Sequence, residues 1–325
     1  MSFEIPKESN AGKVMEVTLG ATSEQGGTRS HTITIGGSTG LPFHFFEGKH
    51  PHRPVVAMEV FDKVPPKYPA YLKDYYQDVL DKPGAMAKKC VDEYEAELIS
   101  IRLEGTHPEK GNKSVEQAVK VVSQVLESVK VPLIVTGHSH FEKINEVMKK
   151  VCEVTAGENC LINYVETDNY KTIAAACLAY KHNLVAQTPI DVNLAKQLNI
   201  LLTDMNFPPE NIVMDPLTGT LGYGLEYTYS IMERIRNDGL AGDKMLAFPM
   251  LINPGYETFK VKESRAPEQD YPEWGDLARR GIYWEIATAM SLLVAGAELI
   301  IMYHPQAVEV VKKKIKEMFD SKIGT

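Results

Sequence analysis

The chain has 325 residues, of which 44% are hydrophobic and 24% are charged, a composition typical of soluble globular proteins. Its formal net charge of −8 argues against a nucleic-acid-binding surface or a surface for anionic membranes. The first residues contain no basic segment followed by an apolar one, and no apolar run approaches the ~20 residues of a membrane helix. We therefore expect a cytoplasmic protein with no nucleic-acid partner and no membrane contact.

Residues 1–50 are expected to form an N-terminal extension that contains a β-hairpin. Apolar and polar residues alternate over 14–21 and again over 31–35, and the intervening Gln25-Gly-Gly-Thr28 is typical of a turn. A hairpin that precedes a barrel often closes its bottom. We divide the chain into this extension and a second domain over residues 51–325.

The second domain repeats a strand followed by a helix eight times. Short segments rich in Val, Ile and Leu predict strands at 54–60, 98–103, 132–136, 161–165, 184–188, 212–215, 245–251 and 299–303. Apolar residues at i, i+3 and i+4 spacing predict helices at 84–96, 114–129, 141–151, 169–181, 191–203, 226–237, 277–295 and 306–319. Strands that are apolar throughout are typical of a parallel sheet buried on both faces. The sequence thus predicts the α/β class and a (β/α)8 TIM barrel.

Two long inserts depart from this alternation. Residues 61–82 follow the first strand and contain three prolines and four tyrosines, whereas residues 253–276 follow the seventh strand and are rich in charged, proline and aromatic residues. Segments that follow strands lie at the mouth of a barrel, where the carboxyl ends of the strands meet. Because long loops at this end usually serve binding, we expect both inserts to form a binding surface.

The four cysteines give no indication of a cluster site. Cys90, Cys152, Cys160 and Cys177 contain no C-x-x-C pair, whereas an iron–sulfur cluster normally takes closely spaced cysteines. We interpret them as buried small hydrophobic residues.

The segment from residue 211 to residue 224 is the most informative part of the chain. A short apolar strand ends on Asp215, Pro216 stops the ladder, and a loop rich in Gly and Thr leads into the next helix. Such a turn holds a carboxylate and bare backbone N–H groups where ligands bind in parallel α/β folds. Together with the other strand ends it predicts a site at the mouth, formed by Glu104, His138, Asn163, Glu166, Thr188, Asp215, Thr218, Gly219, Asn253 and Tyr303.

The sequence His138-Ser139-His140 allows two interpretations. Imidazoles are common zinc ligands, so the pair could belong to a metal-dependent hydrolase. Hydrolases of that type usually place the pair after the first strand, where this chain has Glu59 and Asp62 instead. We favour a polar loop in which one histidine caps the following helix, and we assign no metal ligand.

Asp215 and Asn163 also leave two possibilities open. A carboxylate and an amide from neighbouring strands can bracket a flat heterocycle with an amide edge and an amine edge. Alternatively, the two side chains simply hydrogen-bond each other inside the barrel. An Asp-Pro turn after the sixth strand with an Asn in the fourth resembles the pterin-binding barrels, which are the dihydropteroate synthases and the methyltetrahydrofolate methyltransferases. The resemblance is partial, because those enzymes use further Asp and Asn residues at earlier strand ends.

A closer resemblance covers essentially the whole chain. It rests on Phe61-Asp-Lys-Val-Pro-Pro-Lys-Tyr-Pro, Ile101-Arg-Leu-Glu-Gly-Thr-His-Pro, Asn163-Tyr-Val-Glu, Met214-Asp-Pro-Leu-Thr-Gly-Thr-Leu-Gly-Tyr-Gly and Asn253-Pro-Gly. These segments resemble the small subunit of the corrinoid iron–sulfur protein, whose archaeal counterpart is the delta subunit of the acetyl-CoA decarbonylase/synthase complex.

That resemblance implies a methyl carrier of the reductive acetyl-CoA (Wood–Ljungdahl) pathway. In this family a cobalamin takes a methyl group from methyltetrahydrofolate on a separate methyltransferase and delivers it to acetyl-CoA synthase. The large subunit holds a [4Fe–4S] cluster and the main corrinoid domain, and the barrel mouth of the small subunit covers the corrin from the other side. The ten strand-end residues above are then candidates for contact with the cobalamin, and none is assigned a catalytic role.

The sequence itself agrees that a corrinoid role requires a partner. It contains no D-x-H-x-x-G motif, which supplies an imidazole to cobalt in many corrinoid modules, and no cysteine set for a cluster. A stand-alone pterin-dependent methyltransferase is the main alternative, and a metal-dependent hydrolase is the weaker one.

Overall fold

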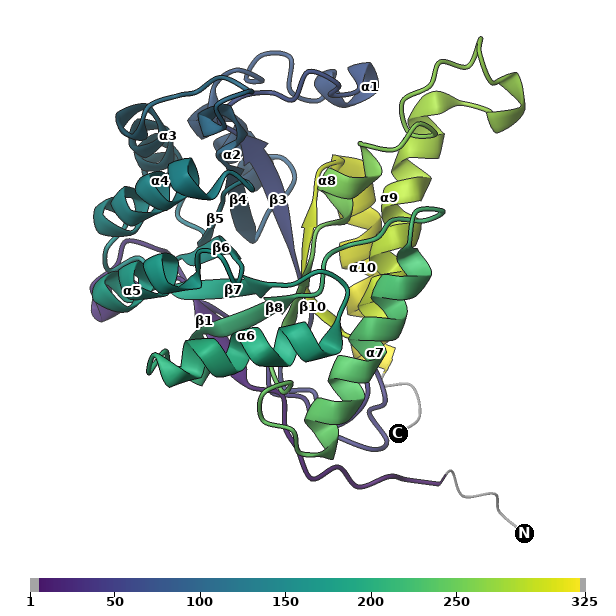
Figure 1. Ribbon diagram of the computed structural model, residues 1–325. Helices are drawn as coiled ribbons and strands as arrows, with labels where there is room; N and C mark the ends of the chain where they lie inside the picture. Colours follow the sequence, from purple (N-terminus) through teal and green to yellow (C-terminus); the bar gives the residue numbers. More distant parts are fainter. Residues whose placement is uncertain (1–5, 322–325) are drawn as a thin grey trace.

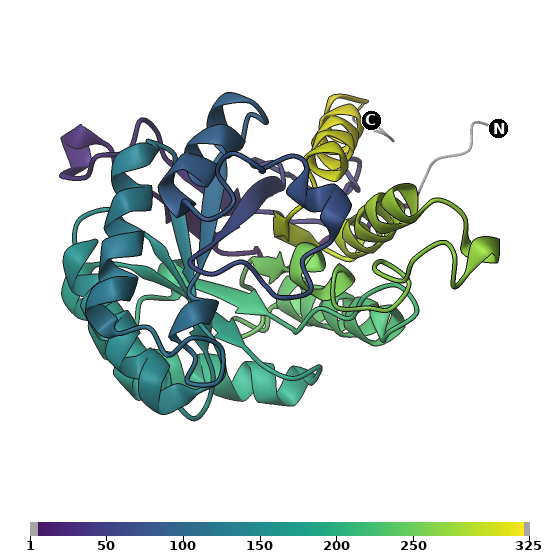
Figure 2. The same ribbon diagram turned by 90° about the horizontal axis from the view of Figure 1, so that it is seen from above.

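The computed structural model describes residues 6–321, which form a closed barrel of eight parallel strands surrounded by helices (Figures 1 and 2). The strand order around the barrel is β10-β3-β4-β5-β6-β7-β8-β9. The strands are β3 (Val55–Phe61), β4 (Leu98–Arg102), β5 (Leu133–Thr136), β6 (Leu161–Val165), β7 (Asn183–Gln187), β8 (Ile212–Asp215), β9 (Met250–Ile252) and β10 (Ala297–Met302). The predicted TIM barrel is confirmed.

The helices on the outside follow the predicted pattern, with ends that differ by a few residues. They are α2 (Pro83–Asp92), α3 (Val115–Ser128), α4 (Phe141–Val154), α5 (Tyr170–Tyr180), α6 (Val192–Asp204), α7 (Leu225–Ala241), α9 (Leu277–Val294) and α10 (Pro305–Ser321). Ser114 caps α3 by accepting the backbone N–H of Gln117, whose side chain returns to the Ser114 backbone as a capping box. None of the helices in the described part of the chain has both the length and the apolar composition of a membrane span.

An antiparallel hairpin closes the bottom of the barrel, as expected. Strand β1 (Glu16–Leu19) pairs with β2 (Ile33–Gly36), and the chain turns between them at Gly26, whose φ of 88° suits glycine. Val17, Leu19 and Ile35 of the hairpin are fully buried in one cluster with the inward residues at the amino ends of the barrel strands. Figure 1 shows β1 at one end of the barrel, with α1 (Ala70–Lys73) and the loop before α9 at the other.

The predicted strand over residues 245–251 is wrong in its extent. Only Met250–Ile252 is a strand, whereas the preceding residues form a turn in which Asp243 accepts the backbone N–H groups of Met245 and Leu246. Pro249 carries no N–H, so it cannot donate to a ladder. The apolar residues of this turn, including Phe248, are buried by packing rather than by strand pairing.

Both mouth inserts contain short helices. The first carries α1 and the second carries α8 (Pro254–Thr258), followed by a long loop with one 3-10 turn at Pro272–Trp274. The four cysteines are buried in the main core, as expected from their positions in apolar segments.

Candidate functional site

A ring of polar side chains lies inside the barrel, one step closer to the mouth than the apolar layer that packs on the hairpin. Side chains alternate along a strand, so a residue two positions after an inward apolar residue also points inward. Ala57, Leu161 and Val213 are inward and apolar, and Glu59, Asn163 and Asp215 follow them. Asn163, Asp215 and neighbouring residues line a cavity of about 230 Å³. Its barrel side is formed by Arg102, Thr136, Asn163, Gln187, Asp215, Thr218 and Asn253.

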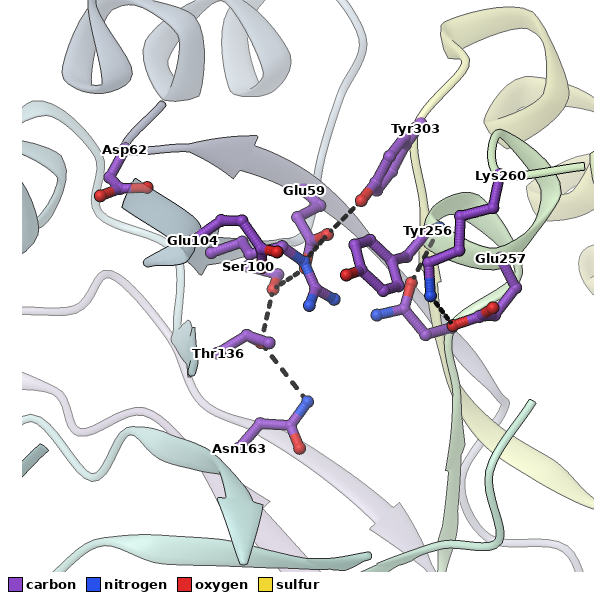
Figure 3. A network of polar contacts seen from close by, with 12 residues as sticks. Glu59, Asp62, Ser100, Glu104, Thr136, Asn163, Tyr256, Glu257, Lys260 and Tyr303 are labelled. Carbon is purple, nitrogen blue, oxygen red and sulfur yellow. Dashed lines mark hydrogen bonds and ion pairs between the residues drawn. The ribbon is translucent and has the colours of Figure 1, made fainter. Parts of the chain in front are cut away.

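One side of this ring is an ion pair that is almost fully buried (Figure 3). Arg102 Nε donates to Glu59 Oε2 at 2.7 Å, the hydroxyl of Tyr303 donates to the same oxygen at 2.7 Å, and Ser100 donates to Oε1 at 2.8 Å. Glu59 is 1% exposed and Arg102 is 3% exposed. A charge buried to this extent is tolerated only when it is paired, so the carboxylate fixes the guanidinium in place.

The ring continues through weaker hydrogen bonds to the opposite wall. Ser100 and Thr136 join their hydroxyls at 3.2 Å, and Asn163 Nδ2 lies 3.4 Å from Thr136 Oγ1. Figure 3 shows Asn163 with its nitrogen toward Thr136. The oxygen of the Asn163 amide is buried and has no hydrogen-bond partner among the described residues.

Asp215 anchors the far wall. Its Oδ2 accepts Gln187 Nε2 at 2.9 Å, and its Oδ1 accepts the backbone N–H of Leu217 at 2.9 Å. Burial raises the pKa of Asp215 to about 6, although both hydrogen bonds favour the charged form. Strand β7 lies between the strands of Asn163 and Asp215, so the two are not on neighbouring strands as predicted. Gln187 and Leu217 take the place of the direct pairing with Asn163 that the sequence left open. The Gln187 Oε1 atom is the second buried amide oxygen of the ring without a partner in the described chain.

The insert after β9 contributes the outer wall of the cavity. Asn253 caps α8 by accepting the backbone N–H of Tyr256 at 3.2 Å, which turns the Tyr256 ring over the mouth. The Arg102 guanidinium lies 3.8 Å from the centre of that ring, and Lys260 Nζ lies 3.6 Å from it. Lys260 also pairs with Glu257 at 2.7 Å.

Three histidines from two loops gather beside the cavity, and their hydrogen bonds fit a structural role. His140 Nδ1 accepts the backbone N–H of Lys143 at 3.4 Å and caps α4, which confirms the favoured interpretation of this residue. His138 Nδ1 accepts the backbone N–H of His140, and its Nε2 lies 2.9 Å from the Thr106 hydroxyl. Burial, followed by the nearby His107, lowers the pKa of His138 to about 4, so it is neutral at pH 7. Within residues 6–321 no group of three His, Cys, Asp or Glu side chains could hold a metal ion.

A second cavity of about 530 Å³ adjoins the first. Both share Glu104, Lys110, Tyr256 and Lys260, and Lys110 pairs with Glu104 between them. The wall of the second cavity comes from the first mouth insert and from Tyr303. Burial raises the pKa of Glu104, but Lys110 and Arg102 outweigh it and the pKa lies below the usual value.

The structure brings seven of the ten predicted site residues to these two cavities. They are Glu104, His138, Asn163, Asp215, Thr218, Asn253 and Tyr303. Glu166, Thr188 and Gly219 are absent from the lining of both cavities. The Glu166 carbonyl accepts the backbone N–H of Tyr170 at the start of α5. The Thr188 N–H donates to the Asp215 carbonyl, and the Gly219 N–H donates to the Thr228 hydroxyl.

The residues of the site that sequence reasoning missed include Arg102, Gln187, Tyr256 and Lys260. A signal existed for Arg102, because it lies two positions after Ser100 and four after Leu98, in phase with the inward side of its strand. Gln187 has the same phase relative to Val185, which is inward and apolar. No comparable signal exists for Tyr256 and Lys260, because an insert has no strand period.

Solved structures of dihydropteroate synthases share this fold. The enzyme from Xanthomonas albilineans with 4-aminobenzoic acid has a TM-score of 0.57 at 13% identity, covering 86% of this chain and 96% of that one. The enzyme from Coxiella burnetii in complex with pteroic acid has a TM-score of 0.56 at 14% identity, covering 87% and 98%. At such low identity the likeness concerns the barrel alone.

Curated relatives are much more similar in sequence. The acetyl-CoA decarbonylase/synthase complex subunit delta of Archaeoglobus fulgidus is 41% identical over 317 residues, which is 96% of this chain and 70% of that protein. Subunit delta 1 of Methanosarcina thermophila is 38% identical over 314 residues, covering 95% and 71%. The delta subunit of Methanocaldococcus jannaschii is 34% identical over 314 residues, covering 96% and 76%.

The family profile of the CO dehydrogenase/acetyl-CoA synthase delta subunit matches residues 16–313. That range includes the hairpin, all eight barrel strands and both mouth inserts. The chain therefore belongs to the CO dehydrogenase/acetyl-CoA synthase delta subunit family.

Proposed function

We propose that this chain is the small subunit of a heterodimeric corrinoid iron–sulfur methyl carrier of the reductive acetyl-CoA pathway, and that its barrel mouth forms one wall of the cobalamin site. The observation that carries the proposal is family membership over residues 16–313. In the proposal the large subunit holds most of the cobalamin and the [4Fe–4S] cluster. Methyltetrahydrofolate methyltransferase and acetyl-CoA synthase are the donor and acceptor partners, and the assembly works in the cytoplasm.

The size and polarity of the mouth support a wall rather than a pocket for the whole cofactor. The inner cavity of about 230 Å³ is smaller than the roughly 300–1,000 Å³ of ordinary small-molecule sites, so it admits a side group and not a macrocycle. When bound, the cobalt of the cobalamin would supply the methyl-transfer chemistry, as cofactors generally do. The predicted residues that line the two cavities, and that would hold its rim, are Glu104, His138, Asn163, Asp215, Thr218, Asn253 and Tyr303.

Three of the carboxylates at the mouth support binding and orientation rather than proton transfer by this chain. Glu59 is held by Arg102, Glu104 by Lys110 and Glu257 by Lys260. A general base needs a lone pair directed at the substrate, whereas these carboxylates already accept from protein cations. Both ring nitrogens of His138 are hydrogen-bonded as well, and the four thiols are buried in the core. The mouth therefore offers few nucleophiles that would compete for a transferable methyl group.

Co-expression with the large corrinoid iron–sulfur subunit tests the proposal. We expect the two chains to copurify in a one-to-one complex that contains cobalt and iron, measured by size-exclusion chromatography and elemental analysis. Purification of this chain as a stable monomer with stoichiometric cobalamin or with a cluster would contradict the proposal. So would a failure of the two chains to associate.

A stand-alone pterin-dependent methyltransferase is the second candidate, because Asn163, Gln187 and Asp215 place hydrogen-bond acceptors on one wall of the cavity. This function requires tight binding of methyltetrahydrofolate by the isolated chain. Isothermal titration with methyltetrahydrofolate decides between the two functions. Binding that disappears in Asp215→Ala would favour the second candidate, whereas no binding agrees with the subunit role.

A further inference from the structure

The far wall of the inner cavity has hydrogen-bond acceptors that the protein leaves unused. Asn163 is 2% exposed and Gln187 is 7% exposed, and the amide oxygen of each is buried without a partner in the described chain. Both side chains line the cavity on neighbouring strands, beside the Asp215 carboxylate. Because a buried acceptor without a donor is unfavourable, this wall favours a bound group that brings hydrogen-bond donors.

A flip of the Gln187 amide cannot provide the missing donor. Its nitrogen donates to Asp215 Oδ2, so a flipped amide would place Oε1 against the carboxylate. Ser100 donates its hydroxyl hydrogen to Glu59, so Thr136 donates to Ser100 and accepts from the Asn163 nitrogen. Both amides therefore keep their oxygens available for a donor from outside the protein.

The opposite wall carries a hydrogen-bond donor, the Arg102 guanidinium. Arg102 carries five N–H groups, of which the Nε–H is committed to Glu59. Its guanidinium carbon lies 3.8 Å from the centre of the Tyr256 ring, and the guanidinium lines the cavity, so its remaining N–H groups can serve an acceptor there. The cavity thus has acceptors on one side and a fixed cationic donor on the other.

Each cation that lines the cavity already has a carboxylate partner. Arg102 pairs with Glu59, Lys110 with Glu104 and Lys260 with Glu257, so none of them requires an anionic ligand. A carboxylate ligand would meet Asp215 and leave both amide oxygens without donors. An ammonium or guanidinium ligand would meet Arg102 and offer it no acceptor. The fitting group is uncharged, small, and has two N–H donors opposite one carbonyl oxygen.

We propose that the inner cavity binds an uncharged primary carboxamide, with its N–H groups toward Asn163 and Gln187 and its carbonyl oxygen toward Arg102. The proposal rests on the proposed function, because the rim of a cobalamin carries several primary carboxamides of this kind. One such side chain would enter the cavity while the macrocycle lies across the mouth. The cavity would then select a corrinoid by its amidation.

The test compares cobalamin with its monocarboxylic acids, each having one peripheral amide hydrolysed, on the complex of this chain with the large subunit. We expect at least one acid to bind roughly tenfold more weakly than cobalamin, since its carboxylate leaves two acceptors unpaired. Asn163→Ala and Gln187→Ala should shrink this difference by weakening cobalamin selectively. Asn145→Ala is the matched control, because the amide oxygen of Asn145 also has no partner among the described residues but lies on α4, outside the cavity.

A second measurement uses the isolated chain and does not depend on the variants. Propionamide should shift the side-chain amide NMR signals of Asn163 and Gln187, whereas propionate at the same concentration should not. Equal binding of all the acids, or a difference unchanged in both alanine variants, would overturn the carboxamide site even if the complex holds cobalamin. A complex that holds no cobalamin would instead overturn the proposed function. Methyltetrahydrofolate that shifts the same signals while propionamide does not would assign the acceptors to a pterin edge.

Discussion

Replacing Asp215 by Asn should stabilise the isolated chain at neutral and basic pH. The carboxyl has a pKa of about 6 in the folded state against an ordinary value of 3.8, with burial as the main cause. At 1.36 kcal/mol per pKa unit, the charged carboxylate lowers the free energy of unfolding by about 3 kcal/mol relative to the protonated form. Asn fits the site, because Gln187 can turn its unpartnered oxygen toward the new amide N–H.

The sign of the pH dependence makes the prediction specific. Between pH 3.8 and about 6 the folded state keeps the Asp215 proton that the unfolded state has lost, so stability from this group falls as the pH rises. The advantage of Asp215→Asn should therefore be small near pH 4, grow toward pH 6 and stay constant above it. Urea unfolding of both proteins at several pH values, followed by circular dichroism, measures the difference. A variant that is less stable at pH 8, or an advantage that does not change between pH 4.5 and pH 8, would refute the reasoning.

Three further changes test the ring, the hairpin and the mouth. Glu59→Ala should cost about 3–5 kcal/mol in urea unfolding because it leaves Arg102 buried without its partner, and a loss within 1 kcal/mol would contradict the buried ion pair. Leu19→Ala should cost about 2–5 kcal/mol if the hairpin is part of the barrel core, and separate melting of hairpin and barrel would contradict that packing. Deleting the exposed loop tip at residues 267–275, while keeping the buried Ser264, should weaken association with the large subunit in surface plasmon resonance. Unchanged affinity with an unchanged melting temperature would exclude this insert from the interface.

The barrel could be predicted from the sequence because each strand carries its own signal. Apolar segments such as Leu98–Arg102 are short, bounded and followed by helical spacing, and a parallel sheet requires burial on both faces. The failure at residues 245–251 has a local cause. The Asp243 turn and Pro249 interrupt hydrogen bonding in a segment whose composition alone resembles a strand.

The site could be predicted only in part. Asp215 was found because it is a polar residue that ends an apolar strand, and Asn163 because it is a polar residue inside one; the structure places both in one cavity. Arg102 is part of an otherwise apolar strand, and its role depends on Glu59 in the neighbouring strand, a contact 43 positions away in the sequence. Tyr256 is positioned by the Asn253 cap, so its place over the mouth follows from the tertiary fold and not from a pattern.

The Arg102 side of the inner cavity and the side with Asn163 and Gln187 are held rigid by different contacts. This difference affects how the mouth could recognise a cofactor. On the donor side, Glu285 of α9 accepts the backbone N–H of Tyr303 at 2.6 Å, Tyr303 donates to Glu59, and Glu59 fixes Arg102. This chain of contacts connects an outer helix to the cation in the cavity, so the guanidinium direction is set before any ligand arrives. On the acceptor side, the Gln187 amide is oriented by Asp215. Side chains that are oriented before binding lose little entropy when a ligand binds. The difference in interaction energy between an amide and an acid therefore appears almost fully as a difference in binding affinity.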